Sequence, residues 1–186
     1  MVLPIYVYGA DVLRKKAEEA NLSDPAVVDE IKKLIPKMWE TMEKADGVGL
    51  AAPQVGISIR LLIVDGSLLS EELHELKDFK RVMINPVVLE ESEETIEFNE
   101  GCLSIPDVNA SIERPKTIKV SYIDDQFNKK EELLDNFACR MVQHELDHLD
   151  GILFTDRAAP IRKKILQSKL NNIKNGKVKP DYIIHR

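Results

Sequence analysis

The segment Gln143-His144-Glu145-Leu146-Asp147-His148 places two histidines four residues apart, among apolar residues at helical spacing. Successive residues of an α-helix are rotated by roughly 100°, so His144 and His148 lie about 40° apart on one face. Two imidazoles in this arrangement can bind one metal ion, and Glu145 beside them can handle the protons of a water activated there. The segment therefore predicts a metal-binding helix at the centre of the fold.

The flanking residues set the limits of this helix. We expect it to begin at Asn136 and to end before Gly151, because glycine favours the position just after a helix. Met141 and Phe137 precede His144 by one and two turns on the same face. We expect them to form an apolar wall beside the metal, with ordinary core packing as the alternative.

A catalytic metal site needs a third protein ligand and one open position. Cys102 is the preferred candidate, because a thiolate is a stronger donor than a carboxylate and metal binding keeps it deprotonated. It stands in Glu100-Gly101-Cys102-Leu103-Ser104, where Gly101 lets a neighbouring group approach. The alternative is a buried structural cysteine. Cys139 is rotated by about 140° from His144 and is expected in the core.

A second segment, Gly47-Val48-Gly49-Leu50-Ala51-Ala52-Pro53-Gln54-Val55-Gly56, is rich in small residues and has one polar side chain, Gln54. Such a segment lets the backbone approach a ligand closely. It lacks the Lys-Ser/Thr pair that closes a phosphate-binding loop, which excludes that class of site. A plain connection from a helix to a strand is the alternative.

The remaining elements predict an α+β fold. Helices are expected over residues 10–20 and from Asp24-Pro25 to Ala45, the second bent at Pro36. Strands are expected over residues 59–65, 82–90, 95–99, 116–123 and 131–134, with a polar excursion over residues 67–80. Pro86 indicates an edge strand or a bulge. Helices before and after a run of short strands indicate largely antiparallel sheets around the metal-binding helix.

The composition indicates a cytoplasmic protein. A length of 186 residues suits one domain, and 44% hydrophobic with 31% charged residues is ordinary for a soluble protein. Two cysteines form no disulfide framework, which fits a reducing compartment. No apolar run reaches the ~18 residues of a membrane span, and the N-terminus has no signal pattern.

Positive charge is concentrated at the C-terminus. Residues 160–186 hold eight Lys or Arg against one acid, a net charge of +7, whereas residues 1–159 carry −13. We assign residues 1–159 to a catalytic domain and residues 160–186 to a basic helix and tail of the same domain. The helix over residues 160–174 has an apolar stripe of Ile161, Ile165, Leu166, Leu170 and Ile173. A basic tail predicts an anionic partner such as nucleic acid, with a solubilising tail as the alternative.

Three segments together resemble the peptide deformylases, in the order and rough spacing of that family: residues 47–56, 100–104 and 143–148. The helix over residues 160–174 resembles the C-terminal helix of bacterial members that carry one. The resemblance implies a hydrolase that removes the N-formyl group from N-formylmethionine of new polypeptides and releases formate. Nascent chains emerge from ribosomes, whose surface is largely RNA, so we expect the basic helix to dock there. No membrane and no specific DNA is expected as a partner.

The resemblance also implies roles for single residues. It implies three metal ligands, namely Cys102, His144 and His148. Iron(II) is the usual native metal of the family, and zinc, nickel or cobalt can occupy the site. Glu145 would be the general base and acid, while Gln54 and the backbone N–H of Leu103 would hold the formyl oxygen.

The substrate would contact a further group of residues. Gly49 would hydrogen-bond the substrate through its backbone, with Gly101 nearby. The methionine side chain needs an apolar slot, for which the candidates are Val48, Leu50, Phe137 and Met141. Glu100 would pair with Arg114 in a structural role, with a surface ion pair as the alternative. The family often has arginine at the position of Asn109, to which we assign no substrate role.

Two other interpretations remain open from the residues alone. His-Glu-x-x-His also serves zinc endopeptidases, whose third ligand usually lies downstream; here the choices are Asp150, Asp156 or His185. A metal-stabilised module that docks on nucleic acid would instead have four protein ligands and no open position. His74 is expected to be a surface histidine.

Overall fold

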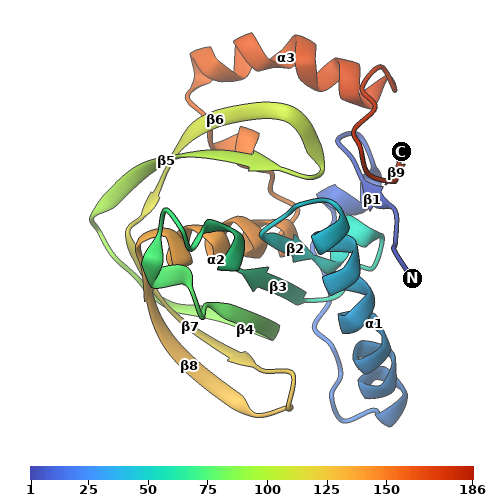
Figure 1. Ribbon diagram of the computed structural model, residues 1–186, viewed down its shortest axis with the longest axis vertical. Coiled ribbons are helices and arrows are strands. Elements are labelled where there is room, and N and C mark those ends of the chain that lie inside the picture. The colour runs from blue at the N-terminus through green and yellow to red at the C-terminus, as the bar shows by residue number, and fades with distance from the viewer.

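The computed structural model describes residues 1–186 and contains an antiparallel sheet of five strands in the order β2-β3-β4-β7-β8 (Figure 1). The strands are β2 (Gly49–Ala51), β3 (Leu61–Asp65), β4 (Lys80–Glu91), β7 (Thr117–Ile123) and β8 (Lys129–Asp135). A separate hairpin consists of β5 (Thr95–Cys102) and β6 (Ile105–Pro115). The predicted α+β class with short antiparallel sheets is therefore confirmed.

Three helices are arranged around these sheets. Figure 1 shows α2 (Asn136–Leu149) between the five-stranded sheet and the β5–β6 hairpin, α1 (Pro25–Lys44) beside the sheet, and α3 (Pro160–Lys174) over β6. Short 3-10 turns are η1 (Asp11–Arg14), η2 (Ala52–Val55), η3 (Ser67–Leu69), η4 (His74–Leu76) and η5 (Phe154–Arg157). The chain ends meet, because β1 (Ile5–Tyr6) pairs in parallel with β9 (Ile184–His185). No helix combines the length and hydropathy needed to cross a bilayer.

The apolar run of β3 determines the layering. Leu62 and Val64 share a core with Val142 of α2, whereas Leu61 and Ile63 share one with the buried face of α1. Neighbouring residues of a strand point to opposite faces, so a strand with a continuous apolar run is buried on both sides. A third core fills the space between β6 and α3. The central helix is thereby held between two sheets.

The helix limits agree with the sequence, with one exception. Asp24 caps α1 by accepting a hydrogen bond from the backbone N–H of residue 26, at 2.9 Å, and Pro36 lies inside the helix without ending it. Gly151 follows α2 with a φ of 73°, as expected. The helix predicted over residues 10–20 is wrong. Only η1 forms there, because Ala17 and Glu18 donate their N–H groups to the carbonyls of residues 149 and 58 instead.

Some strands differ from the prediction. β6 was not predicted, although its buried residues alternate through Val108, Ala110 and Ile112. β1 and β9 have two residues each, too few for a recognisable pattern. β4 is a central strand, so the edge alternative for Pro86 is wrong and the bulge alternative is right: the register with β7 shifts there.

The apolar stripe of α3 is only partly buried. Leu166, Leu170 and Ile173 pack against β6, but Ile161 and Ile165 are 74% and 60% exposed. The predicted apolar stripe is therefore buried at its C-terminal end and exposed over the first turns of the helix. These turns instead present apolar and basic side chains together to solvent.

Asn85, at the bulge of β4, holds the segment before α1. Its φ is 50°, and its side chain bonds both the N–H of Ala20, at 2.8 Å, and its carbonyl, at 2.9 Å. We expect Asn85→Ala to lower the free energy of unfolding by about 2–4 kcal/mol, because it leaves two backbone groups unpaired and strains φ. Asn85→Gly should cost about 1 kcal/mol less, since glycine tolerates this φ. Denaturant unfolding checks both values; a loss under about 1 kcal/mol in both variants would contradict the role of this side chain.

Candidate metal centre and active site

Cys102, His144 and His148 converge from two elements on one point. α2 supplies the histidines from successive turns, and β5 ends at the cysteine. One donor atom from each residue lies within 4.8 Å of the other two, and Cys102 Sγ is 3.3 Å from His148 Nε2. The structure therefore brings together the three residues that the sequence nominated as a ligand set.

This donor set suits a divalent transition metal. One sulfur and two imidazole nitrogens are ligands that zinc and iron accept, and three protein ligands are usual in catalytic sites. Burial lowers the pKa of His148 well below its ordinary value, which keeps the ring in its neutral, metal-binding form. Burial acts the same way on His144, but the charges of Glu145 and Cys102 raise its pKa well above the ordinary value. The charged groups around His144 thus favour positive charge at the position of the cluster.

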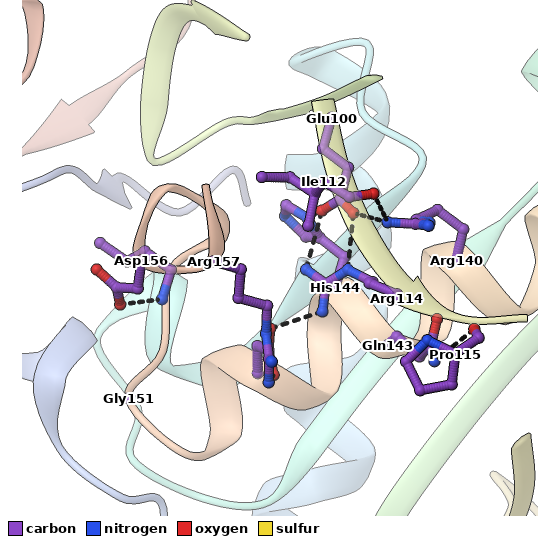
Figure 2. A network of polar contacts seen from close by, with 12 residues as sticks. Glu100, Ile112, Arg114, Pro115, Arg140, Gln143, His144, Gly151, Asp156 and Arg157 are labelled. Carbon is purple, nitrogen blue, oxygen red and sulfur yellow. Dashed lines mark hydrogen bonds and ion pairs between the residues drawn. The ribbon is translucent and has the colours of Figure 1, made fainter. Parts of the chain in front are cut away.

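Glu100 connects His144 to a buried network of charges, drawn in Figure 2. Its Oε1 lies 2.8 Å from His144 Nδ1, which leaves Nε2 of that ring for the cluster. Arg114 donates to both carboxylate oxygens, at 2.7 and 2.9 Å, and Arg140 donates to Oε2 at 2.5 Å. Burial would raise the pKa of Glu100, but hydrogen bonds from His144 and Arg114 hold it well below its usual range. The pair of Glu100 and Arg114 is therefore a buried one, and the surface alternative is wrong.

Asp147 extends this network along α2. It accepts a bond from Arg114 at 2.7 Å, and Arg157 donates to both of its oxygens at 2.6 and 2.8 Å. Arg140 also donates to the carbonyls of Ile112 and Ile96 in the hairpin. The network fixes the rotation of α2 relative to the hairpin that carries the cysteine. The sequence interpretation missed Arg140, although a charge one turn before a candidate ligand was a usable signal.

Glu145 is buried beside the cluster. Its side chain is nearly inaccessible, and its Oε1 has no hydrogen-bond partner in the protein. A Cβ at Gly49 would lie 2.5 Å from Glu145 Oε2, so only glycine leaves room for this carboxylate. Burial raises the pKa of Glu145 to about 7. A carboxyl group with such a pKa can both accept and donate a proton near neutral pH.

Gln54 points its amide at the turn that follows the cysteine. Its Oε1 accepts a bond from the backbone N–H of Ala51 at 2.9 Å, which fixes the orientation of the amide. Its Nε2 then donates to Ser104 Oγ at 3.1 Å and lies 3.5 Å from Cys102 Sγ. Leu103 and Ser104 form this turn, between β5 and β6. Gln54 and Leu103 therefore both lie next to Cys102, one of the three candidate metal ligands.

A cavity of about 760 Å³ opens over these groups. Most residues with a predicted site role line it: Val48, Gly49, Gln54, Gly101, Cys102, Leu103, Phe137, Met141, His144 and Glu145. Two do not: His148, which is buried, and Leu50, whose assignment to the methionine slot is wrong. Leu50 is fully buried in the core with α1, because it points to the opposite face of β2 from Gly49.

Other parts of the lining were not predicted. Leu69 brings the excursion of residues 67–80 to the cavity, and the tail contributes residues 179–182. Asn109 also lines it, and its Oδ1 would be 2.8 Å from a Cβ at Gly101, so this glycine leaves room for the asparagine. Nothing in the pattern of these residues distinguished them from ordinary surface positions.

The alternative ligands lie elsewhere. Asp150 pairs with Arg60 at 3.0 Å, and Asp156 pairs with Arg14 at 2.6 Å. His185 stacks on Tyr6, and His74 is exposed. Burial raises the pKa of Cys139 to about 11, as expected for a core thiol. None of these residues belongs to the cluster, so the downstream ligand of a zinc endopeptidase finds no counterpart.

Comparisons with known proteins agree with this geometry. The family model of polypeptide deformylases matches residues 2–164. A peptide deformylase of Flavobacterium psychrophilum is 47% identical, covering 98% of this chain and 95% of its own length, and that of Christiangramia forsetii is 43% identical over 98% and 94%. The crystal structure of peptide deformylase from Thermus thermophilus superposes with a TM-score of 0.82 at 39% identity, covering 95% and 99% of the two chains. The chain therefore belongs to the peptide deformylase family.

Proposed function

We propose that this protein removes the N-formyl group from the N-formylmethionine of newly made polypeptides and releases formate, in a metal-dependent hydrolysis. The family relationship gives this reaction. One observation carries it to the residues: Cys102, His144 and His148 converge beside the buried carboxylate of Glu145, and all of these except His148 line an open cavity. The N-formylmethionyl nascent chain is accordingly the substrate.

We propose iron(II) as the native metal, with zinc, nickel or cobalt able to replace it. The three ligands would be Cys102, His144 and His148. A site of one sulfur and two nitrogens accepts all four metals, so availability decides between them. When bound, the metal supplies Lewis acidity and lowers the pKa of a water to near neutrality.

Residues of the protein carry out proton transfer, stabilisation of the developing charge and substrate binding. Glu145 takes the proton of the attacking water and passes it to the leaving amine, which suits a carboxyl group with a pKa of about 7. Gln54 Nε2 and the N–H of Leu103 donate to the formyl oxygen as negative charge develops there. Gly49 offers its backbone to the substrate, close to the carboxylate.

The cavity also accounts for the substrate class. Val48, Phe137 and Met141 provide apolar surface for the methionine side chain, and Leu69 adds to it. A formyl carbon carries only hydrogen on its second side, so we propose that a tight space at the metal would accept formyl and exclude acetyl. Gly101 lies at the same wall and would contact the substrate backbone.

Glu145→Gln tests the proton carrier. The variant keeps the shape of the side chain but loses the base, so turnover of a formyl-Met peptide should fall by roughly 10³-fold or more while bound metal is unchanged. Formate release and metal analysis give the two values. Glu93→Gln, at an exposed glutamate, is the control and should match the wild type. Wild-type turnover in Glu145→Gln would exclude this carboxylate as the proton carrier.

Cys102→Ser tests the ligand set. We expect the metal content and affinity to drop by at least about tenfold, because an alcohol is a far weaker donor than a thiolate. Cys139→Ser is the matched control, since that sulfur is buried outside the cluster and its loss should leave metal binding intact. Full metal content in purified Cys102→Ser protein would remove this residue from the ligand set.

We propose that the protein works in the cytoplasm and docks on ribosomal RNA through residues 160–179. The exposed side of α3 supports this, because it carries Lys163, Lys164 and Lys169 together with Ile161 and Ile165. The other side of the helix packs in the same core as β6, which supports its assignment to the domain of residues 1–159. No membrane and no specific DNA is proposed as a partner.

Charge reversal tests this docking. Changing Lys163, Lys164 and Lys169 to Glu should weaken binding to purified ribosomes and reduce its salt dependence, by a slope of about one for each phosphate that the protein no longer neutralises. Reversal of the exposed Lys15, Lys16 and Lys77 is the control for net charge. Equal ribosome binding by the two triple variants across a salt series would contradict the proposal.

A further inference from the structure

The tail after α3 returns to the active-site cavity. It turns at Gly176, whose φ is 76°, and ends in β9, which lies beside β1 (Figure 1). The N–H of Ile5 donates to the carbonyl of Ile183 at 2.9 Å, and that of Val7 to the carbonyl of His185 at 3.1 Å. The tail therefore has a defined path, and the residues just before β9 line the cavity.

Tyr182 is the tail residue that contacts the turn of Leu103 and Ser104. Its ring is half-buried in the cavity wall, and its hydroxyl donates to the backbone carbonyl of Leu103 at 2.6 Å. Burial raises the pKa of this phenol, and the nearby Cys102 and Asp107 raise it further. The hydroxyl is therefore protonated, and a donor, throughout the neutral range.

The turn of Leu103 and Ser104 is held at two other points. The N–H of Tyr8 donates to the carbonyl of Ser104 at 2.8 Å, and Gln54 Nε2 donates to the hydroxyl of the same residue. Both of these bonds restrain Ser104. The bond from Tyr182 restrains the carbonyl of Leu103 itself.

The direction of the Leu103 N–H depends on the direction of its carbonyl. Only two backbone torsions, φ and ψ, lie between the two groups, because the adjoining peptide units are planar. The sulfur of Cys102 contacts His148 and Gln54, so a fixed carbonyl on Leu103 leaves its N–H little freedom to turn. A donor to developing charge is effective only when its direction is set before the reaction.

We propose that Tyr182 is a positioning residue, whose hydroxyl holds the Leu103 carbonyl and thereby aims the N–H of Leu103 at the formyl oxygen. The inference rests on the proposed function, and specifically on Leu103 as an oxyanion donor. It makes the tail of residues 175–186 part of the active site. The family model stops at residue 164, so this assignment goes beyond what that match provides.

Tyr182→Phe tests the hydroxyl alone, because the ring and its packing remain. For a formyl-Met peptide, we expect kcat to fall about fivefold, the size of one missing hydrogen bond, with little change in KM. Hydrogen–deuterium exchange of the peptide covering residues 100–106 should accelerate by a similar factor. Metal content and thermal stability should stay close to those of the wild type.

Tyr6→Phe is the matched control. Tyr6 lies in β1 of the same paired ends and stacks on His185, but its hydroxyl does not bond the turn. This variant should keep wild-type kcat and exchange. Thermal unfolding of both variants is also measured. A lower melting temperature would reveal a general loosening of the β1–β9 pairing.

The outcomes separate the inference from the proposed function. An active wild type with unchanged kcat in Tyr182→Phe would overturn the inference alone. So would equal losses in both variants, or a loss explained entirely by lower metal content, since either result indicates a merely structural tyrosine. No formate release by the metal-loaded wild type would overturn the proposed function and this inference together.

Discussion

The buried carboxylate of Glu100 is the interaction on which the site depends. A charge removed from water is stable only when it is paired and fully hydrogen-bonded, and loss of one partner of such a pair typically costs about 3–5 kcal/mol. Glu100 has three partners, namely Arg114 on β6 and Arg140 and His144 on α2. Because each comes from a different turn or strand, the hairpin and the helix can meet in only one register. The cysteine at the end of β5 is thereby placed against the histidines of α2.

The two sides of helix α2 therefore have different surroundings. Its apolar side, with Val142 and Leu149, packs on the five-stranded sheet and supplies the hydrophobic stabilisation. Its polar side faces the hairpin and carries ligands, base and counter-charges. Exposed ion pairs typically contribute only about 0.2–1 kcal/mol. The geometry of the site thus depends on the buried charges and not on the exposed ones.

Periodic features were predictable from the sequence, and long-range contacts were not. The limits of α1 and α2 followed from a cap, a proline and a glycine, and the cluster of Cys102 with two histidines followed from residue chemistry. The assignment of Leu50 to the methionine slot was wrong because a composition pattern does not tell which face of a short strand meets the cavity. Arg140 and the tail were missed because their partners lie 28–44 and 79 residues away in the chain. The alternation along β6 was present, but the prolines at residues 106 and 115 concealed it.

The pairing of β1 with β9 has a consequence for folding. It joins Ile5 to Ile184, so this contact closes a loop of about 180 residues. The entropy lost on closing a loop rises only with the logarithm of its length, so the closure costs little more than that of a much shorter loop. Contacts of such long sequence separation slow folding more than they lower stability, so we expect β1 and β9 to pair after the sheets around α2 have formed.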